Sequence, residues 1–168
     1  MKITIPYKYI KSADIFRDEK DVRKFCQGFQ LRNGKLMTTN GHYLFMAPVE
    51  HGNEFLFNFI GKIPTGADNV EIDLDDNMAI FTHEKKGVVA QLGIEIIDSP
   101  CFDEKGVTES FSLSSVDAIS FQGKYLGDIA KASKILGIDA VVIEPSGSNG
   151  VSRIEIKECE VYLMPCRI

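Results

Sequence analysis

The stretch Gln30–Pro48 reads QLRNGKLMTTNGHYLFMAP and carries two turn signals within nineteen residues, Asn33-Gly34 and Asn40-Gly41. Asn-Gly is typical of type I′ hairpin turns, because both central residues of such a turn need a positive φ. The residues between the two turns alternate roughly between polar and apolar. The apolar run after the second turn stops at Pro48, which cannot continue a central strand. We therefore expect a three-stranded antiparallel meander, with strands over 29–32, 35–40 and 42–47.

The composition limits the classes of function. The chain has 168 residues, 44% of them hydrophobic, which is enough for one or two small domains with a core. With a net charge of −5, the chain lacks the overall basic excess of a general nucleic-acid binder. Any contact with DNA would therefore need a local basic face. We expect no membrane span and no signal peptide, since no apolar run is long enough.

The cysteines form no recognisable metal or redox motif. There is no CxxC, and no histidine lies near a cysteine at metal-ligand spacing. We expect free thiols in a reducing compartment, the cytoplasm, with no metal and no cofactor. The four cysteines are Cys26, Cys101, Cys159 and Cys166.

The chain repeats one order of elements. The alternation of apolar residues predicts a strand over 2–5, a helix over 7–16 and the meander, followed by strands over 55–60, 70–74, 78–83 and 88–97. Gly61, Pro64 and Gly66 leave room for at most one helical turn after residue 60. The segment 99–110 is polar and contains Pro and Gly, so we expect a linker there.

The pattern starts again after this linker. We expect a strand over 118–121, a helix over 123–136, and strands over 140–144, 151–157 and 160–165. The helix has an apolar stripe at helical spacing and a C-cap at Gly137. Its stripe is Tyr125, Leu126, Ile129, Ala132 (or Ala130) and Leu136. The unit of strand, helix and three strands thus occurs three times, with the middle helix nearly lost. This predicts an α+β fold with antiparallel sheets and helices on one face.

Four segments resemble the bacterial DNA polymerase III β sliding clamp, in the family's order. Asp21–Gly28 and Leu36–Leu44 resemble two motifs of its middle domain. Phe121–Ile129 resembles the start of a helix in its third domain, and Val161–Ile168 resembles the C-terminal ending of the family. The resemblance implies a clamp-like domain over residues 1–104 and a half-domain over 105–168. Asn40 and Tyr43 depart from the Asp and Arg usual in the family.

The resemblance also implies a peptide-binding groove, because clamps bind partner peptides in an apolar cleft between these two domains. Methionine suits such a groove, since its flexible thioether adapts to varied partners. The alternative is that residues such as Leu44 and Met164 are ordinary core residues. The groove residues implied are Cys26, Thr39, Gly41, His42, Leu44, Met164, Pro165, Cys166 and Arg167.

A second implied surface faces DNA, because clamps line their central hole with helices. On the helix over 123–136, three lysines spaced seven and then three residues apart lie opposite Leu126 and Ile129. Two more lysines lie on the helix over 7–16. Contacts of this kind bind phosphates without reading sequence. The alternative is a solvated helix face. The implied DNA-facing residues are Lys8, Lys11, Lys124, Lys131 and Lys134.

Three functions follow as hypotheses. The first is a clamp-like processivity factor that assembles around DNA as a tetramer or a dimer. The second is a clamp mimic that does not encircle DNA and captures clamp-binding proteins through the same groove. The third, an enzyme, has no support, because His42 lacks a nucleophile or metal partner at a recognisable spacing.

Overall fold

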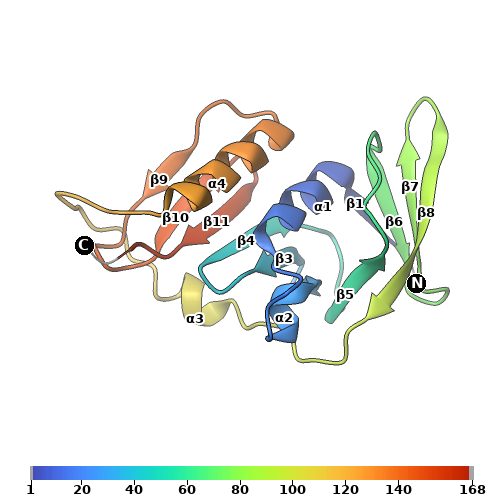
Figure 1. Ribbon diagram of the computed structural model, residues 1–168, viewed down its shortest axis with the longest axis horizontal. Helices are drawn as coiled ribbons and strands as arrows, with labels where there is room; N and C mark the ends of the chain where they lie inside the picture. The colour runs from blue at the N-terminus through green and yellow to red at the C-terminus, as the bar shows by residue number, and fades with distance from the viewer. Residues whose placement is uncertain (1, 167–168) are drawn as a thin grey trace.

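The computed structural model describes residues 2–166, and these form one antiparallel sheet of eleven strands with helices on it (Figure 1). Along the sheet the strands run β1-β6-β7-β8-β5-β2-β3-β4-β11-β10-β9. The strands are β1 (Lys2–Pro6), β2 (Phe29–Arg32), β3 (Lys35–Thr39), β4 (Tyr43–Pro48), β5 (Phe55–Ile60), β6 (Asn69–Asp73), β7 (Met78–His83), β8 (Gly87–Ile96), β9 (Val142–Glu144), β10 (Ser152–Ile156) and β11 (Cys159–Leu163). The helices are α1 (Tyr7–Ala13), a 3₁₀ turn (Asp14–Phe16), α2 (Lys24–Gln27), α3 (Lys105–Thr108) and α4 (Gly123–Leu136). The predicted α+β class is confirmed.

The meander is confirmed as β2, β3 and β4, with Leu31 opposite Leu36 and Thr38 opposite Phe45. Its first turn has the expected type I′ backbone, with φ of 52° at Asn33 and 72° at Gly34. The prediction of a second type I′ turn was wrong, because only Gly41 has a positive φ there. The Asn40 side chain instead accepts hydrogen bonds from the backbone N–H groups of the two residues after Gly41, which turns the chain without a left-handed asparagine.

Helices α1 and α4 lie side by side on one face of the sheet (Figure 1). Strand β4 is buried on both faces. Tyr43, Phe45 and Ala47 belong to the main core, whereas Leu44 and Met46 belong to a smaller cluster. Successive residues of a strand point to opposite faces, so this smaller cluster lies on the face opposite α1 and α4. The buried residues 43–47 of β4 therefore separate two apolar layers.

The strongest predicted helix is confirmed over its whole length as α4. It ends at Gly137, whose φ of 76° is left-handed, as expected for a C-cap. The apolar stripe was wrong at one position, because Leu126 is 40% exposed whereas Tyr125 and Ile129 are buried. Leu126 thus stands beside the packed stripe and faces solvent.

Two further predictions are corrected. The strand expected over 118–121 does not form, because that segment makes only an isolated bridge between Ser120 and Cys166. A short helix, α2, forms within the segment 22–27, which the sequence did not identify as helical. As expected, residues 61–66 carry no helix. The division into segments 1–104 and 105–168 stays a prediction.

The segment after the linker continues the sheet of the segment before it. Strand β11 pairs antiparallel with β4, with Val161 opposite Phe45 and Leu163 opposite Tyr43. The main core is also shared, since Ile154 and Ile129 belong to the same buried cluster as Phe45. The β4–β11 pairing therefore adds the last three strands to the sheet beside the meander, and the packing of α4 against α1 holds them there.

Candidate functional site

An apolar cavity of about 250 Å³ opens where β4 meets β11. We call it the outer groove, because Leu44 belongs to the small cluster on the face opposite α1 and α4. It is lined from three parts of the chain, namely the segment around α2, the β3–β4 hairpin, and the linker with the last strands. Its lining residues are Arg23, Phe25, Thr39, Gly41, His42, Tyr43, Leu44, Phe102, Val107, Val151, Tyr162 and Met164.

The structure brings together five of the predicted groove residues from the two ends of the chain. Thr39, Gly41, His42 and Leu44 come from the hairpin and face Met164, which follows β11. The backbone N–H of Met164 donates to the carbonyl of His42 at 2.9 Å, so the two walls are directly joined. This junction follows from the β4–β11 pairing, which no local pattern in the sequence specified.

The other predicted groove residues do not line the cavity. Cys26 is completely buried, and burial raises the pKa of its thiol to about 11. Pro165 and Cys166 are partly buried, and Cys166 bonds through its backbone N–H to the carbonyl of Ser120. Arg167 lies outside the described residues. Pro165 and Cys166, the described residues after Met164, therefore do not contribute to the lining of the cavity.

Leu44 and Met164 were expected to be either groove residues or ordinary core residues. The structure gives a different answer for each. Leu44 is 2% exposed and belongs to the small buried cluster, so it is a core residue whose side chain also forms the floor of the groove. Met164 is 48% exposed, so its thioether is available at the rim. An exposed methionine above an apolar floor can adapt to a bound apolar side chain.

Sequence reasoning missed the wall supplied by α2 and the linker. The rings of Phe25 and Phe102 lie 5.6 Å apart, and the buried Gln30 joins their backbones. Its side-chain amide donates to the carbonyl of Phe25 at 3.2 Å and accepts from the N–H of Phe102 at 2.5 Å. A glutamine at a buried position of a strand was the signal that could have indicated this wall.

Arg23 forms the charged rim of the outer groove. Its guanidinium donates to both carboxylate oxygens of Asp21, at 2.9 and 2.7 Å, and to the carbonyl of Asn40 at 3.1 Å. The side-chain bond from Arg23 lowers the pKa of Asp21 to about 2. A Cβ added to Gly41 would lie 2.5 Å from the guanidinium nitrogens. Glycine therefore lets Arg23 cross the turn at the mouth of the groove.

His42 and Tyr43 connect the groove to α4. The His42 ring stacks on Tyr125 with 5.6 Å between centroids. The hydroxyl of Tyr43 lies 3.2 Å from a carboxylate oxygen of the buried Asp128 and 3.3 Å from the carbonyl of Ile15. Burial, followed by the charge of Asp128, raises the pKa of Tyr43, so it stays a neutral donor. The tyrosine that departs from the family pattern thus links the two segments.

The predicted DNA-facing lysines lie on α1 and α4, the two helices that share one face (Figure 1). Two of them are engaged by carboxylates. Lys8 lies 3.1 Å from Glu158, and Lys131 lies 2.9 Å from Asp128. Lys124 and Lys134 are exposed, and Lys11 is partly buried. The face therefore carries less uncompensated positive charge than the sequence suggested.

The Lys8–Glu158 contact predicts a pH dependence of stability. Partial burial raises the pKa of Glu158, but hydrogen bonds from Tyr9 and Lys8 outweigh it and lower the pKa from 4.5 to about 2. A carboxyl group with a lowered folded-state pKa stabilises the fold above its unfolded pKa and loses that contribution as the pH falls toward 2. In urea titrations, Glu158→Gln should reduce the stability loss between pH 4.5 and 2. An unchanged pH profile would contradict this role.

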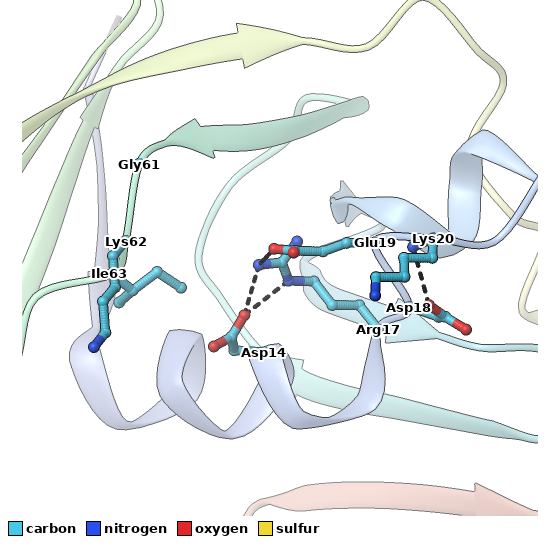
Figure 2. A pocket seen from close by; sticks show the side chains of 8 residues that line it. All are labelled: Asp14, Arg17, Asp18, Glu19, Lys20, Gly61, Lys62 and Ile63. Carbon is cyan, nitrogen blue, oxygen red and sulfur yellow. Dashed lines mark hydrogen bonds and ion pairs between the residues drawn. The ribbon is translucent and has the colours of Figure 1, made fainter.

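A second, polar pocket of about 410 Å³ lies between the 3₁₀ turn and the segment after β5 (Figure 2). Its charged groups bind one another. The Arg17 guanidinium donates to Asp14 at 2.8 Å and lies 2.5 Å from Glu19, as the dashed lines in Figure 2 mark. Because these groups already satisfy each other, the outer groove is the better candidate site.

Two negative findings concern metals and membranes. Within residues 2–166, no group of three or more His, Cys, Asp or Glu side chains is arranged to hold a metal ion. Across the same residues, the structure contains no helix with the length and apolarity that a membrane crossing requires.

The comparisons with known proteins agree with this architecture. The fold matches a putative DNA polymerase III β subunit from Eubacterium rectale with a TM-score of 0.68 at 11% identity. The chain has the sliding-clamp fold. The match covers 100% of this chain and 66% of that clamp. The clamp of Bacillus subtilis matches with a TM-score of 0.67 at 12% identity, over 100% of this chain and 64% of that one.

A third clamp-fold match has a bound peptide. The Helicobacter pylori β clamp, solved with a DNA ligase peptide, matches with a TM-score of 0.66 at 12% identity, over 99% of this chain and 66% of that clamp. No protein-family model and no curated protein matches the sequence. The resemblance seen in the sequence is therefore confirmed at the level of the fold, and this chain spans about two thirds of such clamps.

Proposed function

We propose that this chain is a clamp-like accessory protein of DNA replication, which binds peptides of replication or repair proteins in the outer groove. It would act without catalysis or cofactor, in the cytoplasm, and would enclose double-stranded DNA as a homo-oligomer. The observation that carries the proposal is the apolar cavity at the β4–β11 junction, which combines a buried floor with the half-exposed Met164. Apolar pockets with a few polar groups at the rim suit short peptide anchors.

The peptide part of the proposal is tested with a labelled copy of the DNA ligase peptide that the Helicobacter pylori clamp binds. Fluorescence polarisation should detect binding to the wild type. Met164→Ala should weaken it about tenfold, because losing a buried methionine contact removes roughly 1.5 kcal/mol or more. Met164 is 48% exposed in the free protein, so the thermal unfolding temperature of Met164→Ala should equal that of the wild type.

The matched control is Leu113→Ala, which removes another exposed apolar side chain, 66% exposed, outside the groove. It should leave the affinity unchanged. Equal affinity of the wild type and Met164→Ala, or an equal loss in both variants, would contradict peptide binding in the outer groove.

The alternative function is a clamp mimic that binds the same peptides without enclosing DNA. The engagement of Lys8 and Lys131 by carboxylates favours it, as does the net charge of −5. Closed circular DNA separates the two. A protein that encloses DNA stays on the circle and is released when the circle is cut, whereas a mimic binds the peptide and is never retained.

A further inference from the structure

The segment 99–111, which we call the strap, covers the small buried cluster on the face of the sheet opposite α1 and α4. Three of its apolar side chains, Phe102, Val107 and Phe111, pack against that cluster. Two of them, Phe102 and Val107, also line the outer groove. Figure 1 shows α3, the helical turn within the strap, on the opposite side of β11 from α4. The strap therefore forms a wall of the groove as well as covering the apolar layer beneath it.

The C-terminal end of the strap is held by the last strands. The ring of Phe111 meets the ring of Tyr162 edge-on at 6.3 Å between centroids, and the Arg153 guanidinium lies 5.2 Å from it. Directly after the strap, the backbone N–H of Ser112 donates to the hydroxyl of Ser146 at 3.1 Å. These contacts fix one end of the strap to β10, β11 and the turn before β10.

The N-terminal end of the strap is held by the β2–β3 hairpin. The side-chain amide of Asn33, in the turn of that hairpin, donates to Oε1 of Glu104 at 3.0 Å. Glu104 is only 4% exposed, and its Oε2 has no hydrogen-bond partner among the described residues. The Arg32 guanidinium lies 3.9 Å from that oxygen. Burying a carboxylate is costly unless it is hydrogen-bonded, so the Asn33 amide is the main compensation for the burial of Glu104.

Asn33 and Glu104 join the wall of the groove to the sheet without lining the groove themselves. Glu104 lies between the two lining residues of the strap, Phe102 and Val107, and its carbonyl accepts from the backbone N–H of Val107 at 3.0 Å. A displacement of Glu104 would therefore displace both lining side chains. Asn33 is fixed in turn by the tight hairpin, where its φ is 52°.

We infer that Asn33 and Glu104 are positioning residues, which latch the strap to the sheet and so hold this wall of the groove in place for a bound peptide. The inference rests on the proposed function and deepens it, because it names what sets the shape of the peptide site. A strap that acted as a lid, and had to leave before a peptide could enter, would give the opposite result, since loosening it would raise the affinity.

Asn33→Asp tests the latch by placing a second carboxylate against that of Glu104, where like charges repel. The hairpin turn is kept, because Asp-Gly also suits a type I′ turn. In fluorescence polarisation with the labelled DNA ligase peptide, we expect about tenfold weaker binding, equivalent to about 1.4 kcal/mol. In the free protein, hydrogen exchange of the amides over 102–109 should be faster than in the wild type.

The rescue variant combines Asn33→Asp with Glu104→Gln. It reverses the direction of the hydrogen bond, because the new amide in the strap can donate to the new carboxylate in the turn. Both the peptide affinity and the slow exchange over 102–109 should return toward wild-type values. General damage to the hairpin would not be repaired by a second change in the strap, so rescue separates positioning from a merely structural role.

Asn77→Asp is the matched control. Asn77 is also an asparagine with a positive φ, 50°, but it is exposed in the turn between β6 and β7 and lies outside the groove lining. The same substitution there should leave both the peptide affinity and the exchange of the strap unchanged. Thermal unfolding of each variant shows that the substituted chains remain folded.

The two readouts distinguish this inference from the proposed function. Asn33→Asp that binds the peptide as tightly as the wild type, or more tightly, overturns the positioning role and leaves peptide binding in place. A double variant that binds no better than Asn33→Asp overturns it as well. A wild type that binds no peptide rejects the proposed function, and hydrogen exchange alone then decides the latch. Faster exchange in Asn33→Asp that the double variant reverses supports the latch, and unchanged exchange overturns it.

Discussion

Phe16→Ala should lower the free energy of unfolding by about 3–5 kcal/mol, the range for removing a fully buried phenylalanine. Phe16 has no exposed surface. Its ring stacks on Phe45 at 5.1 Å between centroids and meets Tyr43 edge-on at 4.9 Å. It therefore fills the space between the 3₁₀ turn after α1 and the central strand β4. Urea unfolding followed by circular dichroism measures the effect.

The control for this prediction is Phe16→Leu, which keeps most of the apolar volume and should lose clearly less stability than the alanine variant. A loss below about 1 kcal/mol in Phe16→Ala would mean that the site collapses around the smaller side chain, contrary to the close packing described above. The slope of unfolding against urea should stay unchanged, since the folded state buries a similar area.

Tyr43→Phe should lower the free energy of unfolding by about 1–3 kcal/mol, because it removes the hydroxyl that donates to the buried Asp128 carboxylate. The ring contacts with Phe16 and Tyr125 stay in place, so the loss isolates the hydroxyl group. The measurement is again urea unfolding at neutral pH.

A double-mutant cycle with Asp128→Ala, which removes the carboxylate acceptor, shows whether the two groups act together. We expect the double variant to lose less than the sum of the two single losses, since each single change already breaks the same contact. Strict additivity would show that Tyr43 is stabilised through Ile15 instead, whose carbonyl lies 3.3 Å from the hydroxyl. Because His42 precedes Tyr43 in the chain, a weaker peptide affinity of Tyr43→Phe would also show that this contact orders the groove wall.

The outer groove shows which site residues could be predicted from local sequence patterns and which could not. The resemblance placed Thr39, Gly41, His42, Leu44 and Met164 at one site, and the structure brings these five together. It also assigned Cys26, which lies in α2 and has its side chain completely buried. The wall formed by Phe25 and Phe102 depends on the buried Gln30, whose two hydrogen bonds join segments more than seventy residues apart. No spacing in the sequence encodes such a bond.

The local elements follow from short-range signals in the sequence. Asn33-Gly34 determined the first hairpin, the apolar spacing determined α4, and Gly137 determined where that helix ends, because each signal acts through the backbone of neighbouring residues. Only the tertiary structure decided that β11 pairs with β4, that the segment 118–121 stays outside the sheet, and that Lys8 and Lys131 are engaged by carboxylates. These outcomes depend on which distant surfaces meet, and strand pairing between distant segments carries no periodic signal of its own.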